Sequence, residues 1–380
     1  MDEFRIRTRV LDPLGAAERE MLSRFLWPLG LELEADVELS AVVEDNGSPI
    51  ATASIAGDVI KCVGVLPGRE GEGAAAKAVS TIMAEAQAKG RRHLFVYTRP
   101  GNKAIFENLG FYTLAEVKPG SSSGSPAGSP AFSRPEGVTL LENDEHAFEA
   151  WAARIRRNLP GGKAEGAIVV NCNPFTLGHR YLIEKAATAV ASAKPAGGTE
   201  DGAAGGTLLV LVVAGDRSSF PAVVREKLVR SGTADLGNVV VASGGSYCVS
   251  GATFPAYYLK QKSVAAELQA SLDATLFASR IAPAFGIRRR FVGTEPYCEV
   301  TSAYNRAMAA ILPGYGVELI TIPRKEQQGE AISASRVRAA LHDGKLDLAA
   351  TLVPPTTIAW LRSAEATPIL ERIRTGSSRH

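Results

Sequence analysis

The clearest chemical signal in this chain is the string NCNPFTLGH, from Asn171 to His179. It directly follows the apolar segment 167–170 and directly precedes a helical pattern that starts at Gly178. A turn from strand to helix leaves backbone N–H groups unpaired at the helix start, where the helix dipole favours an anion. Gly178 lets a ligand approach the backbone because it has no Cβ. Thr176 and His179 project from the same side of the first turn, and we expect both to donate to phosphate oxygens.

A second segment, Ile332–Arg338 (ISASRVR), lies far downstream and again opens a helical pattern. The hydroxyls of Ser333 and Ser335 at a helix start, with Arg336 and Arg338 beside them, make a clamp for a polyphosphate. Each segment alone also fits a plainer interpretation, a local cap with solvated side chains. Both together, in this order and each at a helix start, favour one phosphate-binding site.

A third apolar stretch ends in Gly293, Thr294 and Glu295. The last two side chains offer hydrogen bonds to a nucleoside, but a plain turn from strand to helix fits the string equally well. Arg324 and Lys325, upstream of the second segment, are expected to add positive charge. Together these residues predict a nucleotide site assembled from three separated parts of the chain.

Residues Arg217–Phe220 follow a strongly apolar run and are expected to line the site at the carboxyl end of that strand. Ser218 and Arg225 are the candidate polar contacts, and a helix cap and a surface charge are the alternatives. The sequence contains no convincing Ser–His–Asp or Cys–His set. A covalent role for Cys172 is not favoured, because a small buried residue suffices at that position.

The elements that must position these residues alternate between strand and helix. Thr207–Ala214 (TLLVLVVA) is a continuous β-rich run, typical of a strand buried on both faces of a parallel sheet. The alternation predicts a Rossmann-like, doubly wound parallel sheet that binds ligands at the carboxyl ends of its strands. The other strands are expected at 167–170, 239–242, 290–292 and 317–322, and the helices at 178–193, 221–231, 257–270 and 300–311.

The first part of the chain has a mixed α/β pattern. Alternating apolar residues and an Asn46–Gly47 turn signal predict a hairpin, and an alanine-rich stretch predicts a helix. Strands are expected at 37–43, 50–56, 60–66 and 92–98, and helices at 74–88 and 102–109.

Two segments rich in Gly, Ser, Pro and Ala, 118–137 and 194–206, cannot bury enough surface to offset the entropy of ordering them. The first is predicted to be a linker and the second a surface loop inside one domain. We therefore expect a mixed α/β domain at 1–117, a connector helix region at 138–165 and a nucleotide-binding domain at 166–372.

Bulk composition restricts the class of protein. The 42 basic and 40 acidic residues leave a formal charge of +2, which gives no reason to expect nucleic acid or a membrane as partner. The four cysteines lie far apart without metal-ligand spacing, which argues against a zinc site or a disulfide framework. No long apolar run is present. A cytoplasmic, soluble protein is expected.

The TxGH and ISxSxxR patterns resemble those of the nucleotidyltransferase superfamily. The resemblance implies that Thr176 and His179 stabilise the α-phosphate of ATP as pyrophosphate leaves, and that the Ile332–Arg338 segment closes over the β- and γ-phosphates. It assigns catalysis to Thr176, His179 and Arg338. It assigns nucleotide binding to Asn173, Phe175, Gly178, Gly293, Thr294, Glu295, Ile332, Ser333, Ser335 and Arg336.

Longer strings narrow the resemblance to one family. NPFTLGHRYLIEKAA, GATFPAYYLK, FVGTEPYCEVTSAYNRAM and ISASRVRAAL resemble the C-terminal domain of citrate lyase ligases over roughly residues 166–360. This implies a ligase that uses ATP, with Mg²⁺ carried by the polyphosphate, to activate acetate as acetyl adenylate. It also implies a pocket for the acid, which Arg217–Phe220 are expected to line. The acetyl group then passes to the thiol of the phosphoribosyl-dephospho-CoA prosthetic group on the citrate lyase acyl carrier protein.

Two other functions fit the same residues. One is an adenylyltransferase that acts on a phosphorylated cofactor precursor. The other is an acetyltransferase whose nucleotide domain only binds. The second is suggested by residues 1–117, which resemble a GNAT acyltransferase. The turn Gly68–Ala74 is similar to that family's pyrophosphate-binding turn, although Gly68 stands where the family has Gln or Arg. Binding of acetyl-CoA and contact with the prosthetic arm are both open roles.

Overall fold

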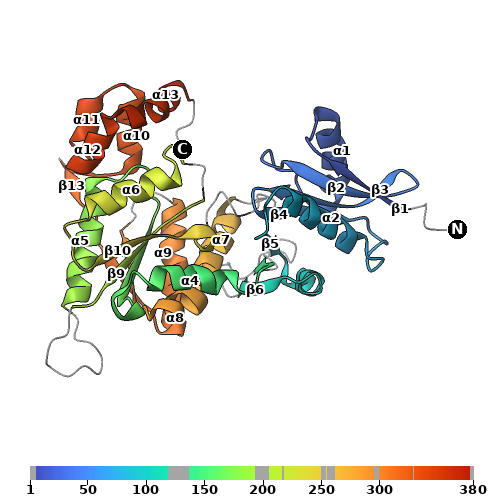
Figure 1. Cartoon of the computed structure of the whole chain (residues 1–380), viewed down its shortest axis with the longest axis horizontal. Helices are drawn as coiled ribbons and strands as arrows, with labels where there is room; N and C mark the ends of the chain where they lie inside the picture. Colours follow the sequence, from blue (N-terminus) through green and yellow to red (C-terminus); the bar gives the residue numbers. More distant parts are fainter. Residues whose placement is uncertain are drawn as a thin grey trace, which may run out of the picture. The chain divides into compact units, whose positions relative to one another are not determined.

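The structure, a computed structural model, describes residues 6–118, 137–192, 205–215, 218–249, 254, 262–294, 299–327 and 329–376. Backbone contacts divide the chain into two compact units, each with its own sheet (Figure 1). Unit 1 comprises Met1–Ala147 and Thr253–Thr275, and unit 2 comprises Phe148–Ala252 and Leu276–His380.

Unit 1 is a mixed α/β unit with a seven-stranded sheet in the order β1-β2-β3-β4-β5-β7-β6. Only β4 and β5 are parallel neighbours, and they pair over just two residues each. Helix α2 packs its alanine-rich face on the sheet. The elements are β1 (Ile6–Leu11), α1 (Ala16–Leu26), β2 (Leu39–Asp45), β3 (Ser48–Ala56), β4 (Val59–Val65), α2 (Ala74–Ala88), β5 (Phe95–Thr98), α3 (Lys103–Glu107), β6 (Tyr112–Val117) and β7 (Val138–Glu142).

The expected linker does not separate two domains. Strand β7 lies between β5 and β6 in the sheet of unit 1, and Val117 pairs directly with Val138. The two ends of the segment 118–137 therefore belong to adjacent strands of one sheet. The expected connector at 138–165 is wrong in its first part, since 138–142 is a strand. Helix α4 (Ala147–Arg156) accounts for the helical pattern that follows.

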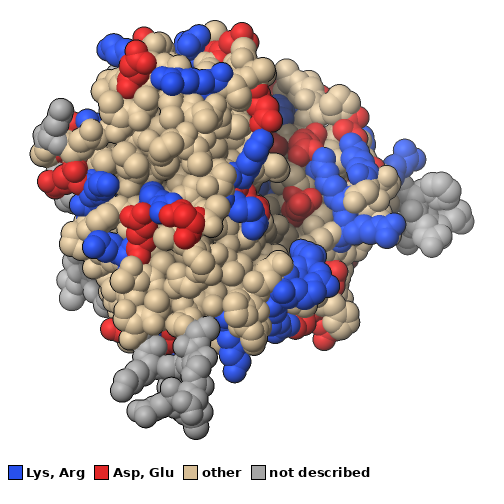
Figure 2. Space-filling view, turned by 60° about the vertical axis from the view of Figure 1, so that its left-hand side comes forward, with Lys and Arg blue, Asp and Glu red and all other residues tan. Residues whose placement is uncertain are grey.

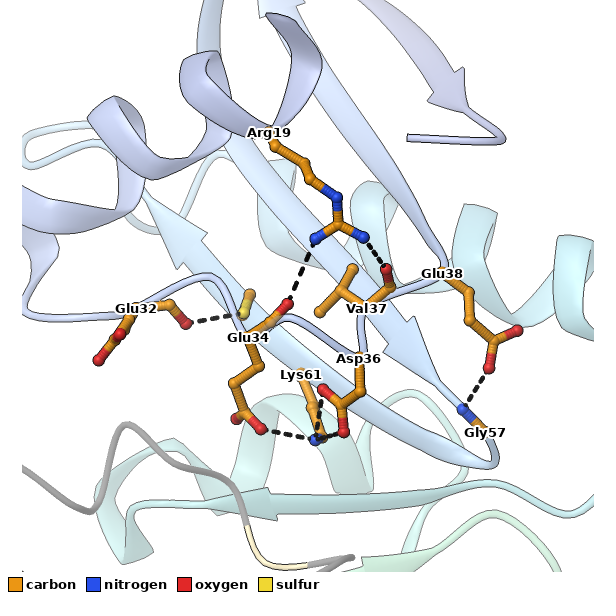
Figure 3. A network of polar contacts seen from close by, with 9 residues as sticks. Arg19, Glu32, Glu34, Asp36, Val37, Glu38, Gly57 and Lys61 are labelled. Carbon is orange, nitrogen blue, oxygen red and sulfur yellow. Dashed lines mark hydrogen bonds and ion pairs between the residues drawn. The ribbon is translucent and has the colours of Figure 1, made fainter. Parts of the chain in front are cut away.

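A buried lysine of strand β4 is the centre of an ion-pair network in unit 1 (Figure 3). Lys61 is 2% exposed, and its ammonium donates to Glu34 at 2.8 Å and to Asp36 at 3.2 Å. Arg19 holds the same segment by donating to the Val37 carbonyl at 2.6 Å. Because a buried charge is tolerated only with a partner, this network fixes the segment 34–37 over the strand.

Unit 2 has the predicted doubly wound parallel sheet, in the order β10-β9-β8-β11-β12. The chain order reverses between β8 and β11. These two strands pair only at Gly166–Ala167 with Arg289–Arg290, near their amino ends. By contrast, β8 pairs with β9 over five residues, and so does β11 with β12. Ligands of such sheets bind outside the carboxyl ends of the strands where the order reverses.

The helices of unit 2 cover the sheet, and α10 to α13 form a group packed against one another and against α6 (Figure 1). The predicted helix at 257–270 instead continues to Leu276; its start lies outside the described residues. The elements are β8 (Gly166–Val170), α5 (Leu177–Ala191), β9 (Leu208–Val212), α6 (Ala222–Gly232), β10 (Val239–Ser243), α8 (Ala282–Phe285), β11 (Arg289–Gly293), α9 (Glu299–Ile311), β12 (Glu318–Ile322), α10 (Ala334–His342), α11 (Leu346–Ala350), α12 (Pro355–Leu361) and α13 (Thr367–Thr375). Helix α7 (Lys262–Leu276) lies between β10 and α8 in the chain, and all of it except Leu276 belongs to unit 1.

Acidic and basic side chains are interspersed on the molecular face in Figure 2, in line with the near balance of charges in the sequence. Within the described part of the chain, no helix combines the length and apolar character that crossing a membrane requires.

Candidate active site

The turn after β8 is held by a reciprocal cap between Thr176 and His179. The Thr176 hydroxyl accepts from the backbone N–H of His179 at 3.3 Å. In return, the backbone N–H of Thr176 donates to Nδ1 of His179 at 3.1 Å, and the hydroxyl lies 2.9 Å from the same nitrogen. The sequence predicted that both side chains would face a phosphate. In the structure the threonine is engaged in fixing the histidine ring.

His179 is held in one protonation state and one tautomer. Burial, with the Arg324 cation as a second cause, lowers the pKa of the imidazole to about 4. The ring is therefore neutral near pH 7. Because Nδ1 accepts from the Thr176 N–H, the proton is on Nε2. The site thus presents a neutral N–H donor, which can stabilise negative charge that develops on a ligand.

Phe175 is fully buried and packs against the imidazole ring of His179. Its ring stacks on His179 with centroids 6.1 Å apart and planes at 13°. Gly232 also lies against this ring, since a Cβ there would be 2.4 Å from the Phe175 ring. Phe175 was predicted to contact the nucleotide, but the structure places it in the core beneath His179. Sequence reasoning missed Gly232, since a glycine at a helix end carries no signal of its distant contact.

Asn173 was also predicted to contact the nucleotide, and the structure gives its side-chain oxygen a different partner. It is 6% exposed, and Oδ1 accepts from the backbone N–H of Phe220 at 3.0 Å. Its backbone carbonyl accepts from Arg338 at 2.6 Å. Burial lowers the pKa of the Arg338 guanidinium. Arg338, predicted to be catalytic, therefore links α10 to the turn after β8.

The two segments that were expected to bind phosphate meet at Gly178. A Cβ on this residue would lie 2.8 Å from the carbonyl oxygen of Ile332. Ile332 is itself buried in the core that the two segments share. Only glycine permits this approach of the two backbones, so the helix starts of α5 and α10 lie together as the sequence predicted.

The start of α10 has the expected hydroxyls and arginine. Ser333 caps the helix by accepting from the N–H of Arg336 at 3.3 Å, and its hydroxyl lies 2.9 Å from that of Ser335. The Arg336 guanidinium pairs with Glu330 at 2.9 Å and is about one-third exposed. Because both side chains of this ion pair are partly exposed to solvent, the pair is weak and an anionic ligand can compete for the guanidinium.

The carboxyl end of β11 is joined to the segment after β12. Arg324 donates through Nε to the carbonyl of Thr294 at 2.7 Å, and its backbone N–H donates to the Thr294 hydroxyl at 3.2 Å. Asn305 donates to the carbonyl of Gly293 at 3.2 Å. Glu295 lies outside the described residues. Arg324, which the sequence assigned a minor role, is the cation that acts on His179.

The expected acid-binding residues have unequal roles. Arg225 is fully buried, and it donates to the carbonyls of Phe220 at 2.9 Å and Val213 at 2.6 Å. It also donates to Asn171, through the carbonyl at 2.9 Å and through Oδ1 at 2.8 Å. Ser218 donates to the same Oδ1 at 3.3 Å. Arg225 therefore ties together the ends of β8 and β9 and the loop that leads to α6.

Two other features of the chain bear on chemistry. Burial raises the pKa of the Cys172 thiol well above its ordinary value, which disfavours a thiolate nucleophile there. Among the residues that the structure describes, no group of three or more His, Cys, Asp or Glu side chains is arranged to hold a metal ion.

In unit 1, the predicted turn Gly68–Ala74 connects β4 to α2. Gly68, Gly71 and Gly73 all have positive φ, of 84°, 83° and 78°. The N–H of Gly68 donates to the Glu70 carboxylate at 2.7 Å. Arg69 donates to Glu72 at 2.7 Å and to Asp45 at 2.9 Å. Carboxylates of the chain itself thus contact the turn that was expected to bind a pyrophosphate.

Comparison with known proteins identifies the family. A family model described as the citrate lyase ligase C-terminal domain matches residues 165–361. The citrate (pro-3S)-lyase ligase of Klebsiella pneumoniae is 35% identical over 347 residues, which cover 90% of this chain and 92% of the relative. The chain belongs to the citrate lyase ligase family. The ligase of Escherichia coli (strain K12) is 34% identical and covers 90% of each chain. As a member of this family, the chain is an enzyme, a ligase.

Several solved structures resemble part of this citrate lyase ligase family member. The match to the crystal structure of Escherichia coli ElaA covers 37% of this chain and 99% of the ElaA chain, with a TM-score of 0.29 and 14% sequence identity. The structure of yncA, a putative acetyltransferase from Salmonella typhimurium with acetyl-CoA, has a TM-score of 0.28 and 20% identity, and covers 37% of this chain and 96% of its own.

Proposed function

We propose that this protein is an ATP-dependent ligase that activates acetate and acetylates citrate lyase. Acetate and ATP give acetyl adenylate and pyrophosphate. The acetyl group then passes to the thiol of the phosphoribosyl-dephospho-CoA group on the citrate lyase acyl carrier protein, and AMP is released. The observation that carries the proposal is the contact of Gly178 with Ile332, which brings two anion-binding helix starts together where the strand order reverses. The names of the relatives support citrate lyase as the partner.

The first step is a displacement at phosphorus. A carboxylate oxygen of acetate forms a bond to the α-phosphorus, and the bond from that phosphorus to the pyrophosphate oxygen breaks. Charge builds on the phosphate oxygens, and the Nε2–H of His179 is suited to donate to them without cost of reorganisation. Ser333, Ser335 and Arg336 are suited to the departing pyrophosphate. Mg²⁺ would be held mainly by the polyphosphate and water.

The second step needs no nucleophile from the protein. The thiolate of the prosthetic group attacks the acetyl carbon, a C–S bond forms, and the C–O bond to AMP breaks. The buried Cys172, with its raised pKa, supports direct transfer rather than an acetyl-cysteine intermediate.

The test is an assay with ATP, acetate and the carrier protein in its prosthetic-group form. Intact mass of the carrier and chromatography of the nucleotides are the readouts. We expect the carrier to gain one acetyl group for each AMP and pyrophosphate released. A dinucleotide product would indicate an adenylyltransferase, and acetylation from acetyl-CoA without ATP would indicate an acetyltransferase; either result overturns the proposal.

A further inference from the structure

Asn171 is the first residue after β8 and lies at the carboxyl end of the sheet. Val170, which precedes it, is paired with β9, since the N–H of Val213 donates to its carbonyl at 2.9 Å. Asn171 is exposed, whereas Arg225 behind it is fully buried. The residue therefore stands on the β9 side of the same turn that carries Thr176 and His179, a position from which it can reach a second substrate.

The orientation of the Asn171 amide is fixed by its neighbours. Arginine has N–H donors and no acceptor, so the atom that faces Arg225 at 2.8 Å must be the amide oxygen. The Ser218 hydroxyl donates to that oxygen as well, at 3.3 Å. Arg225 also donates to the backbone carbonyl of Asn171 at 2.9 Å. Rotation of the Asn171 side chain or backbone would therefore break hydrogen bonds to a buried arginine. The amide NH₂ consequently points away from Arg225, and Asn171 presents two N–H donors on an exposed side chain.

We propose that Asn171 is a binding residue for the carboxylate of the acid substrate, with its NH₂ group donating to a carboxylate oxygen and Arg225 holding the amide in that orientation. This rests on the proposed function, in which a carboxylate must approach the α-phosphate from outside the nucleotide. An amide donor suits this task, because it binds the carboxylate without neutralising the oxygen that must attack phosphorus. Arg225, the obvious cation of the region, acts through Asn171.

The test compares Asn171→Ala and Asn171→Asp with the wild-type enzyme in acetate-dependent exchange of labelled pyrophosphate into ATP. The aspartate variant keeps an oxygen toward Arg225, so it retains that anchor, but it loses both N–H donors and repels a carboxylate. Asn158→Asp is the matched control, since Asn158 is an exposed asparagine of the same unit whose amide donates to the carbonyl of Arg154. Melting temperatures check that every variant is folded.

We expect the KM for acetate to rise about 10- to 100-fold in Asn171→Ala, as for loss of a hydrogen bond to a charged group, and further in Asn171→Asp. The KM for ATP should stay within about twofold. An unchanged KM for acetate, an equal rise in the KM for ATP, or the same change in Asn158→Asp would overturn the inference. If the wild-type enzyme itself shows no acetate-dependent exchange, the proposed function fails instead.

Discussion

At the scale of single residues, the candidate site contains a neutral histidine whose ring is held at one nitrogen and on one face. Thr176 holds Nδ1 through its backbone and hydroxyl, and Phe175 supports the ring face. The imidazole therefore offers one N–H in one direction. A charged imidazolium would attract a phosphate more strongly, but burial beside Arg324 disfavours it. In the proposed reaction, this fixed donor would stabilise the charge that develops on the phosphate.

The protonation of His179 can be measured directly. With a pKa lowered to about 4, its ring signal in NMR should stay that of a neutral imidazole from pH 8 down to about 5.5, whereas an ordinary histidine titrates near 6.5. The His179→Gln variant assigns the signal. Since the unfolded chain binds this proton below pH 6.5 and the folded chain does not, wild-type stability should fall as pH drops from 6.5 toward 4. A midpoint near 6.5 would contradict this description.

Gly232 should control the position of His179 through Phe175. In Gly232→Ala the new methyl group meets the Phe175 ring at 2.4 Å, so the ring and the stacked imidazole must move. We expect the rate of pyrophosphate exchange to fall about 10- to 100-fold, as for a displacement near 1 Å. Gly237→Ala is the control, since a Cβ there meets nothing within 4 Å.

A second substitution separates this effect from simple misfolding. If the clash is the cause, the double variant Gly232→Ala with Phe175→Leu should recover part of the lost exchange, because the smaller side chain relieves it. Equal exchange in Gly232→Ala and wild type, at equal melting temperature, would remove Gly232 from the support of the site.

At the scale of elements, the site is the meeting of two helix starts. Their convergence requires the backbone of Ile332 to lie against Gly178, which leaves no room for a Cβ. In Gly178→Ala the new methyl group displaces the carbonyl oxygen of Ile332, so the start of α10 has to move away from α5. We expect affinity for an ATP analogue, measured by calorimetry, to weaken about tenfold or more.

Gly314→Ala provides the comparison for that experiment, since a Cβ at Gly314 has open space around it. It should bind the analogue like the wild-type protein. Unchanged affinity for the ATP analogue in Gly178→Ala would mean that nucleotide binding does not require the close approach of the two helix starts.

The sequence predicted the parts of the site that are local and missed those that depend on tertiary contacts. The strings around His179 and Ser333 carry their own turn and helix-start signals, so their order and type could be predicted. The burial of Phe175, by contrast, depends on Gly232 at the end of another helix. The role of Arg225 depends on carbonyls of two strand ends. No local pattern encodes such partners.

At the scale of the whole molecule, the chain is organised differently from the composition-based expectation. A Gly/Ser/Pro-rich segment indicates low order but does not reveal whether its two ends are neighbours. Here Val117 and Val138 are paired in one sheet, and residues 253–275 belong to unit 1 as well. The units are therefore not successive stretches of the chain, and a cut within 118–137 would separate two adjacent strands.

Shortening the segment should consequently be tolerated. Replacing residues 119–136 with a short Asn/Gly turn keeps Val117 and Val138 in register and reduces the entropy cost of closing the loop. We expect the free energy of unfolding to stay equal or to rise by about 1 kcal/mol, as measured by urea denaturation. A large loss of stability would indicate that the two strands need the longer connection.

The central claim is that Thr176–His179 and Ser333–Arg338 serve one triphosphate, and a crystal structure with a non-hydrolysable ATP analogue tests it most directly. We predict a triphosphate between the starts of α5 and α10, with His179 Nε2 within hydrogen-bond distance of the α-phosphate and Ser333 or Arg336 on the outer phosphates. A nucleotide bound elsewhere, or one that contacts only one of the two segments, would contradict the claim.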